Sequence, residues 1–298
     1  SDLGGLSAAQ QGALASLFRA IAEGELAAEE ARCRLCEVSA FDPYGTFRGL
    51  TDTADRGWVN AHDIHSWLLA QPHGISATPR EDVAEILLHY TSKAGELRYD
   101  GFSRLALPGG VESAWFKELA FTRSSEVTRS FTANATGRIP PEVAYRLCQI
   151  FEKELDLCRL LKFHRKNLKD LSVSTGSVLK FLDSSQGVCA GIGGLVSPDA
   201  IRALLVDKLG SLTGPQCEAL LRRVNASGAR LVSFGEFIKY LSPPAPPVAA
   251  RLPASVGGGL KEAWMFAPSA DPLSSTRLSG SYPSSSLRTS SPLRASPV

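Results

Sequence analysis

Few residues of this sequence have the type and spacing that catalysis or metal binding requires. Cys33 and Cys36 form a CxxC motif, but no second CxxC and no nearby pair of histidines completes a zinc site. A redox-active CxxC stands at the start of a helix that follows a strand, whereas this one comes late in a predicted helix. His62 and His65 are three residues apart, a spacing that could bind one metal ion and that also fits a solvated helix N-terminus. We favour a structural interpretation for all four residues.

The glycine-rich segment 187–194 resembles a phosphate-binding loop only in its glycine content. It lacks the Lys-Ser/Thr pair of a P-loop, and no predicted buried strand leads into it. The sequence has no GxSxG or HExxH motif, and its five histidines include no convincing general base. We therefore predict that the protein is not an enzyme and that 187–194 is an insertion in a loop.

Glycines recur two residues ahead of an apolar residue, a spacing that suits a tight turn followed by a short strand. In a calcium loop of the EF-hand type, glycine at position 6 makes the turn and position 8 pairs with the sister loop. The glycine and apolar residues are Gly57 and Val59, Gly95 and Leu97, and Gly194 and Val196; in a fourth unit Val232 keeps the apolar position alone.

An internal repeat is the most informative feature of the sequence. Residues 98–108 align without gaps on 233–243, at an offset of 135 that pairs Phe102 with Phe237. Phe47 pairs with Phe181 at nearly the same offset, 134. The sequence therefore predicts two copies of one unit of ~70 residues, each preceded by a long helix. Phe102 and Phe237 are expected at matching core positions at the start of the last helix of each unit, and Phe47 and Phe181 are expected to be structural.

On these spacings the chain resembles the calmodulin superfamily over about 45–108 and 175–242. The resemblance implies an all-α fold built of two EF-hand-like pairs of helix-loop-helix units. Calcium needs oxygen ligands at loop positions 1, 3, 5 and 9 and a carboxylate at 12, and these have largely been lost. The weak candidates that remain are Asp52 and Asp63 in the first loop and Asn225 and Glu236 in the fourth. We expect no cofactor and no tight calcium site.

A second, shorter repeat places tryptophan in polar sequence after each pair. Residues 110–116 resemble 259–265, and these segments contain Trp115 with Phe116 and Trp264 with Met265. Each tryptophan either folds back onto its own pair, filling the groove that a target peptide would fill, or anchors on a partner. Both interpretations remain open from the sequence.

The whole layout is similar to that of a group of protist EF-hand proteins of cilia, flagella and basal bodies. The shared features are a long Glu/Leu-rich helix, a pair that ends in an aromatic-plus-Pro signature, its repetition, and a tail with Ser-Pro-Leu-Arg at 291–294. Some relatives of that group line the inside of doublet microtubules. The resemblance implies a structural protein of the cytoskeleton, located in the cytoplasm at an axoneme or basal body, with tubulin or neighbouring axonemal proteins as partners. The rival interpretation is a calcium-responsive sensor or regulatory subunit.

We divide the chain by its periodicity and composition. Helices are predicted at 8–37, 43–50, 61–70, 79–90 (opened by Thr78-Pro79), 141–170, 175–182, 198–208, 214–224 and 235–241. In the first helix, Glu25, Glu29 and Glu30 are expected on the exposed face, and 109–170 is expected to hold the two pairs apart. The predicted segments are an N-terminal helix (1–39), the first EF-hand-like pair (40–108), a linker with a Trp anchor (109–139), a long helix (140–171), the second EF-hand-like pair (172–243), a Pro/Gly linker with a second Trp anchor (244–267) and a disordered tail (268–298).

The tail is expected to order only against a partner, because its Ser/Pro-rich composition buries little apolar surface. Arg288 and Arg294 would meet an acidic surface and Leu293 would fill a shallow pocket, while phosphorylation of Ser291 or Ser296 would weaken attachment. A run of five basic residues without an acid within 159–169 suits a helix C-terminus or an acidic partner.

Charge and hydropathy set limits on the partners. The formal charge of +2, from 32 basic and 30 acidic residues, gives no bulk attraction for nucleic acid. No apolar run approaches the length of a membrane span, and the N-terminus lacks the layout of a secretory signal. The six scattered cysteines fit free thiols in a reducing compartment.

Overall fold

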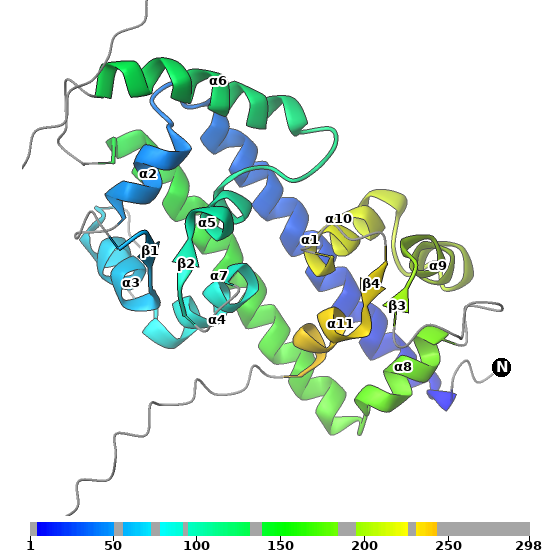
Figure 1. The fold of residues 1–298 in the computed structure, drawn as a ribbon. Helices are drawn as coiled ribbons and strands as arrows, with labels where there is room; N and C mark the ends of the chain where they lie inside the picture. The colour runs from blue at the N-terminus through cyan, green and yellow to red at the C-terminus, as the bar shows by residue number, and fades with distance from the viewer. Residues whose placement is uncertain are drawn as a thin grey trace, which may run out of the picture. The chain divides into compact units, whose positions relative to one another are not determined.

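The computed structural model describes residues 5–50, 56–72, 78–91, 95–131, 139–183, 195–225 and 231–242. These residues are mostly helical, so the predicted all-α class is confirmed. They all belong to one compact unit, Ser1–Ala249. In chain order the elements are α1 (Ala8–Glu37), α2 (Pro43–Gly49), β1 (Trp58–Val59), α3 (Ala61–Ala70), α4 (Arg80–Tyr90), β2 (Leu97–Arg98), α5 (Tyr99–Ala106), α6 (Ala114–Phe131), α7 (Pro141–Asp170), α8 (Thr175–Asp183), β3 (Leu195–Val196), α9 (Pro198–Arg202), the π-helical turn η2 (Ala203–Lys208), α10 (Gly214–Val224), β4 (Val232–Ser233) and α11 (Phe234–Leu241) (Figure 1).

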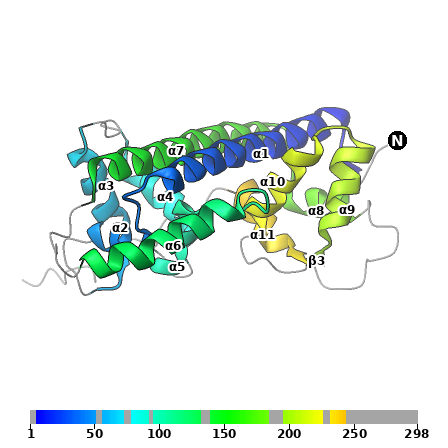
Figure 2. The ribbon, with the colours of Figure 1, turned by 90° about the horizontal axis from the view of Figure 1, so that it is seen from above.

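The two long helices α1 and α7 lie side by side and run in opposite directions (Figure 2). Leu14 near the start of α1 shares a buried cluster with Leu168 near the end of α7, and Leu35 near the end of α1 shares one with Leu147 near the start of α7. The helices are in close contact at Gly24, where an added Cβ would lie 2.8 Å from a Leu157 methyl carbon. A capping box between Ser7 and Gln10 begins α1, and Pro141 occupies the first turn of α7.

Residues 43–106 form a first lobe, from α2 to α5, on the half of the helix pair that contains the end of α1. Strands β1 and β2 pair antiparallel with Val59 opposite Leu97, as the loop spacing predicts. Phe47 and Phe102 meet in the core of this lobe with ring centroids 5.5 Å apart. Gly57 and Gly95 take positive φ values of 65° and 85°, which few other residues adopt.

Residues 175–241 form a second lobe, from α8 to α11, on the other half of the helix pair. Strands β3 and β4 pair antiparallel with Val196 opposite Val232. Phe181 and Phe237 are both buried in this lobe's core, and the ring of Phe237 also packs edge-on against Phe18 of α1 at 6.0 Å. Phe102 and Phe237 are thus buried at matching positions in the first turns of α5 and α11, as predicted.

Four predictions about local structure are wrong in part. The segment 109–139 is not only a linker, because 114–131 form the helix α6, whose Phe116 and Ala120, four residues apart, pack on the core of the first lobe. Thr78-Pro79 is not a cap followed by the first helical residue: Pro79 is itself the N-cap of α4, and the buried Thr78 hydroxyl has no hydrogen-bond partner among the described residues.

The helix expected at 198–208 changes from α to π geometry at Ala203. The prediction that 109–170 holds the two pairs apart is also wrong. The helix α7 packs along α1 and bonds to α4 through Arg165 and Glu85, and Arg223 of the second lobe bonds directly to Tyr90 of the first.

Some predicted features lie outside the described residues. These are Asp52, Gly194, Trp264, Met265, Arg288, Leu293, Arg294, the glycine-rich segment 187–194 and the segments 244–267 and 268–298. Within the described part of the chain, no helix combines the length and the hydropathy that crossing a bilayer requires.

Candidate functional site

Asp63 and Glu236, two of the carboxylates that the sequence suggests as calcium ligands, stabilise helix ends. Asp63 accepts a hydrogen bond from the Asn60 backbone N–H at 2.9 Å, as part of the capping box of α3, and pairs with Arg56 at 3.1 Å. This arrangement satisfies the carboxylate without a metal ion. His62 is exposed on the first turn of α3, and Nε2 of His65 lies 3.0 Å from the Thr78 carbonyl oxygen, so the two rings do not share a ligand position.

In the fourth loop the acidic residue Glu236 also caps a helix. Glu236 accepts from the Ser233 backbone N–H at 3.0 Å and completes the capping box of α11. Asn225 is the C-cap of α10, with its N–H bonded to the Leu221 carbonyl at 2.7 Å. Among the residues that the structure describes, no group of three or more His, Cys, Asp and Glu side chains is placed to hold a metal ion.

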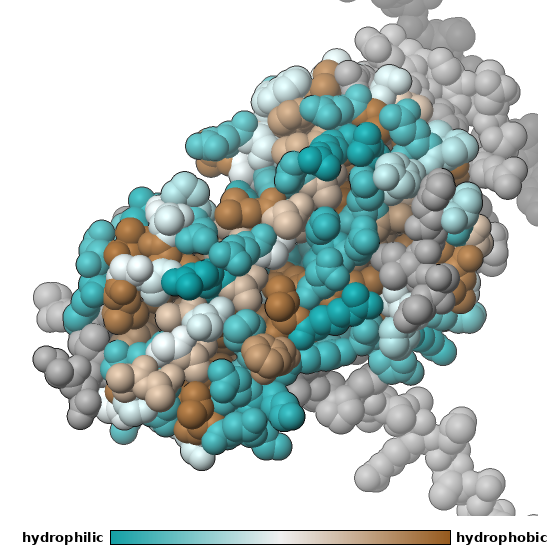
Figure 3. Space-filling model, turned by 180° about the vertical axis from the view of Figure 1, so that it is seen from behind, coloured by the Kyte–Doolittle hydropathy of each residue, from teal (hydrophilic) through white to brown (hydrophobic). Residues whose placement is uncertain are grey.

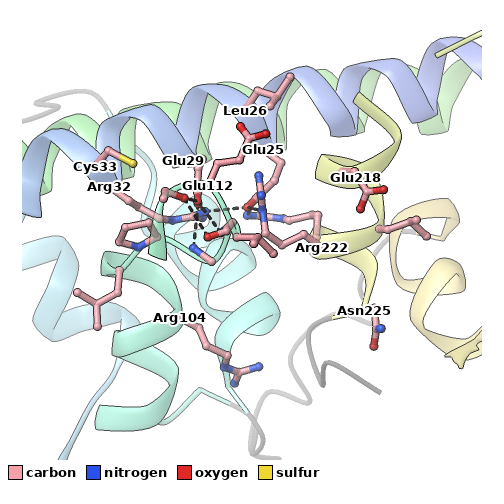
Figure 4. Close-up of a pocket in the computed structure, with 18 of the residues that line it drawn as sticks. Glu25, Leu26, Glu29, Arg32, Cys33, Arg104, Glu112, Glu218, Arg222 and Asn225 are labelled. Carbon is pink, nitrogen blue, oxygen red and sulfur yellow. Dashed lines mark hydrogen bonds and ion pairs between the residues drawn. The ribbon is translucent and has the colours of Figure 1, made fainter. Parts of the chain in front are cut away.

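A cavity of about 1030 Å³ lies between the two lobes and against α1 (Figure 4). Its wall comes from α1, from the chain that follows α5, and from α10 of the second lobe. Glu25 and Glu29 of α1 approach Arg32 and Arg222 at the centre of the view, while Asn225 lies away from this group. Charged side chains of α1 and of the second lobe therefore meet at the cavity floor.

Arg32 of α1 binds to the first lobe and to α7. Its Nε donates to the Leu105 carbonyl at 3.0 Å, and one terminal nitrogen donates to Glu25 at 2.8 Å. The other terminal nitrogen donates to the Tyr90 hydroxyl at 3.0 Å and to Glu154 at 3.1 Å. All of the guanidinium nitrogens thus have acceptors, although the side chain is almost fully buried.

Arg223 of α10 brings the second lobe to the same acids. It donates to both carboxylate oxygens of Glu154, at 2.8 and 2.6 Å, and to the Tyr90 hydroxyl at 2.7 Å. A further contact of 3.2 Å reaches Glu25. We call Glu25, Glu29, Arg32, Tyr90, Glu154, Arg222 and Arg223 the charge cluster. Because it joins α1, α4, α7 and α10, it connects both lobes to both long helices.

Glu29 fixes the chain that leaves the first lobe. It accepts hydrogen bonds from the backbone N–H groups of Gly109 at 3.1 Å and Gly110 at 2.7 Å, and from the Ser113 hydroxyl. Burial opposes ionisation, but the Ser113 hydrogen bond and the charge of Arg222 leave the pKa of Glu29 below its ordinary value. The prediction that Glu25 and Glu29 are exposed is wrong, because both are buried in the charge cluster; Glu30 is exposed as predicted.

A second connection between the lobes is centred on Arg165 of α7. Its Nε donates to the Tyr240 carbonyl at 2.9 Å, and its terminal nitrogens donate to Glu85 of α4 at 2.7 Å and to the Lys239 carbonyl at 3.0 Å. The His89 ring stacks on Tyr240 with centroids 5.1 Å apart. Arg165 is thus buried between the lobes, whereas the other basic residues of 159–169 are exposed.

The protonation states of the charge cluster favour structure over catalysis. Burial raises the pKa of Glu154, but Arg223 and then Arg32 oppose it and hold that pKa at about 2. Burial, assisted by the positive charge of Arg223, lowers the pKa of His89 to about 3, so the ring is neutral near pH 7. Since each carboxylate of the cluster is already paired with arginine, no free general base or nucleophile faces the cavity from this group.

Among the described cysteines, those with a shifted pKa also lack the environment of a reactive thiol. Cys33 is partly exposed and Cys36 is buried, and both lie late in α1 as predicted. Burial raises the pKa of Cys148 to about 11 and that of Cys158 to about 12. A nucleophilic thiol requires a shift in the other direction.

In the first of the two predicted tryptophan anchors, Phe116 attaches to the protein core while Trp115 faces solvent. Phe116 packs against the core of the first lobe, while Trp115 stays 55% exposed and contacts the Phe116 ring at a centroid distance of 4.2 Å. The indole therefore leaves a face available to a partner, and the neighbouring phenyl ring attaches it to the lobe.

Comparison of the chain with models of known protein families, with curated proteins and with solved structures gives no match. The interpretation of the site therefore depends on its own residues. The charge cluster was missed from the sequence. One signal pointed to its Arg32 and to the separate buried Arg165: the two arginines stand 133 residues apart, close to the offset of the internal repeat.

Proposed function

We propose that the protein is a non-enzymatic scaffold of the cytoskeleton, in which two degenerate EF-hand-like lobes form one rigid body that docks on axonemal or other microtubules. The observation that carries the proposal is the buried charge cluster. A sensor of the EF-hand type needs lobes that open when an ion binds, whereas these lobes are tied to each other and to α1 and α7.

The loops support the degenerate EF-hand interpretation. The two loops of each lobe meet through one antiparallel pair of apolar residues, Val59 with Leu97 and Val196 with Val232. Asp63 and Glu236, at the last ligand position of their loops, cap the helices that follow them. Such loops keep the paired architecture of the superfamily while their acids hold helices in place.

Separation of the lobes would be costly. It would remove Arg223 from Glu154 and Tyr90, and Glu154 is 0% exposed. Loss of one partner from a buried ion pair typically costs about 3–5 kcal/mol. The lobes should therefore present a single fixed surface.

The surface features that fit tubulin are basic and aromatic. On the outer side of α7, Phe163 is 66% exposed and Leu160 is 45% exposed, and the exposed Arg159 lies beside them. In the view of Figure 3, from the side opposite to that of Figure 1, hydrophobic side chains form small patches among hydrophilic ones. An exposed aromatic residue next to a cation is suited to a partner surface that is acidic and partly apolar, as that of tubulin is.

Co-sedimentation with microtubules tests the proposal. The full-length chain should sediment with taxol-stabilised microtubules, and Phe163→Ala combined with Leu160→Ala should weaken binding several-fold. Leu69→Ala, at a residue of α3 with a similar exposure of 50%, is the matched control and should bind like the unmodified chain. Absence of the unmodified protein from the pellet would contradict the microtubule assignment. Sedimentation that appears only with calcium would favour the sensor.

A further inference from the structure

A groove of about 830 Å³ lies beside the second lobe, where α7, α8 and the end of α11 come together. Its residues from α7 are Lys162, Arg165, Lys166, Leu168 and Lys169. Val173 and Val178 add apolar surface, and Leu241 and Ser242 lie where the chain leaves α11. The groove also includes Glu85 of α4, which pairs with Arg165 at 2.7 Å and with Lys162 at 3.3 Å. It thus has an apolar floor and a rim with more basic than acidic residues.

The internal repeat identifies the counterpart of this groove in the first lobe. Nε of Arg32 donates to the Leu105 carbonyl at 3.0 Å, and Nε of Arg165 donates to the Tyr240 carbonyl at 2.9 Å. Arg165 follows Arg32 by 133 residues, and Tyr240 follows Leu105 by 135. The same bond joins each long helix to the last helix of its own lobe, so the two halves can be compared residue by residue.

In the first half, the chain after α5 occupies this place. Gly109, Gly110 and Ser113 bind to Glu29, and Phe116 packs on the core that contains Leu35. With the 133-residue offset of the long helices, Glu29 corresponds to Lys162 and Leu35 to Leu168, both of which line the groove. The groove is therefore the position in the second half that the segment 109–116 fills in the first.

We propose that residues 259–266 of this chain bind the groove. Residues 259–265 repeat 110–116, with Ala263-Trp264 at the positions of Ala114-Trp115 and Met265 at that of Phe116. Met265 enters the apolar floor beside Leu168 and Val178, as Phe116 packs in the first half. The inference stands independently of the proposed function, since it concerns the chain's own assembly.

Between the two halves of the repeat, the charge on the segment and the charge on the long helix change in a complementary way. In the first half an acid on the helix, Glu29, accepts from Ser113 of the segment. In the second half the helix carries Lys162 and Lys166, and the residue at the position of Ser113 is Glu262. Lys166 is exposed and makes no ion pair within the described part of the chain, so it is placed to receive that carboxylate.

The connection is long enough. Ser242 lines the groove and Gly259 follows it by 17 residues, which extend to about 60 Å at most. Because the segment is tethered, its effective concentration at the groove is in the millimolar range.

Photo-cross-linking of the full-length chain tests the proposal. Trp264 is replaced by the photoreactive amino acid p-benzoylphenylalanine, and the products are mapped by mass spectrometry. Cross-links within one chain to residues 166–178 are expected, and the same replacement at Tyr282 of the tail should give several-fold fewer. Products that join two chains, or that map to other surfaces, would overturn the proposal, because the occupant would then be a second copy or no specific segment.

Charge reversal supplies an independent readout. Glu262→Lys should lower the cross-link yield from position 264 about threefold or more, and adding Lys166→Glu should restore it. Asp271→Lys is the matched control, because it makes the same charge change outside the segment, and it should leave the yield unchanged. Equal effects of Glu262→Lys and Asp271→Lys, or no rescue by Lys166→Glu, would overturn the pairing. Unchanged circular dichroism and Tm would show that the exposed Lys166 can be altered without unfolding.

Discussion

Replacement of Arg223 by methionine tests how strongly the charge cluster joins the two lobes. The side chain is 5% exposed and makes four contacts of 2.6–3.2 Å with Glu25, Tyr90 and Glu154. Methionine keeps most of the apolar stem but leaves Glu154, which is 0% exposed, with Arg32 as its remaining cation. Removal of one member of a buried ionic group costs about 3–5 kcal/mol, so we expect Arg223→Met to lower the free energy of unfolding by about 4 kcal/mol.

The assay is thermal and urea unfolding of the full-length chain, followed by circular dichroism. For a domain of this size each kcal/mol shifts Tm by about 2–4 °C, so the expected decrease is about 8–16 °C. Arg159→Met is the matched control, because Arg159 pairs with Asp156 at 3.3 Å with 55% of its side chain exposed, and it should cost less than about 1 kcal/mol. An equal, small effect of both variants would refute the reasoning that the cluster holds the lobes together.

The remaining predictions concern pH, the two lobe cores and calcium. In the folded protein the pKa of Glu154 (about 2) and that of His89 (about 3) both lie below the ordinary values of these side chains, so the free energy of unfolding should fall as pH falls from about 6.5 to 3. His89→Gln should flatten the part of this profile between pH 6.5 and 4.5. Urea titrations at each pH measure the profile, and a flat profile would contradict the burial of His89 and the pairing of Glu154 with arginine. Phe102→Ala and Phe237→Ala should each cost about 3–5 kcal/mol, because both rings are buried; near-neutral unfolding curves would show that the two lobe cores are misassigned. About 1 mM calcium should raise Tm by less than about 1 °C, because the loops have lost most of the oxygen ligands that calcium needs. A calcium site at a hundredfold excess over Kd would add about 2.7 kcal/mol, so a shift of several degrees would contradict the structural role of the loops.

The helices and the strand pairs were predictable because their signals are local. Apolar periodicity alone locates α1 and α7, and the spacing from Gly57 to Val59 and from Gly95 to Leu97 predicts which residues pair between strands. The equivalence of Phe102 and Phe237 followed from the repeat, because equal sequence offsets preserve the position within the lobe.

The charge cluster was not predictable in the same way. Glu25 and Glu29 were assigned to a solvated face because charged residues on a helix are usually exposed. Glu25 pairs with Arg223, about 200 residues away, and Glu29 binds the chain at Gly109 and Gly110, about 80 residues away, so their burial becomes visible only when these distant segments are packed against α1. The helix α6 was missed because its polar sequence contacts the first lobe through few apolar residues, Phe116 and Ala120 among them.

The distance between the lobes, measured with and without calcium, would show whether the two lobes form one rigid body. Spin labels placed by His62→Cys on α3 and Lys180→Cys on α8, in a background that carries Cys33→Ser and Cys189→Ser, report it through pulsed electron–electron double resonance. His62, Lys180 and Cys33 are at least partly exposed, Cys189 lies outside the described residues, and the remaining cysteines are buried. A rigid scaffold predicts one narrow distance distribution that is unchanged by about 1 mM calcium. A broad distribution, or a calcium-dependent shift of about 5 Å or more, would contradict it.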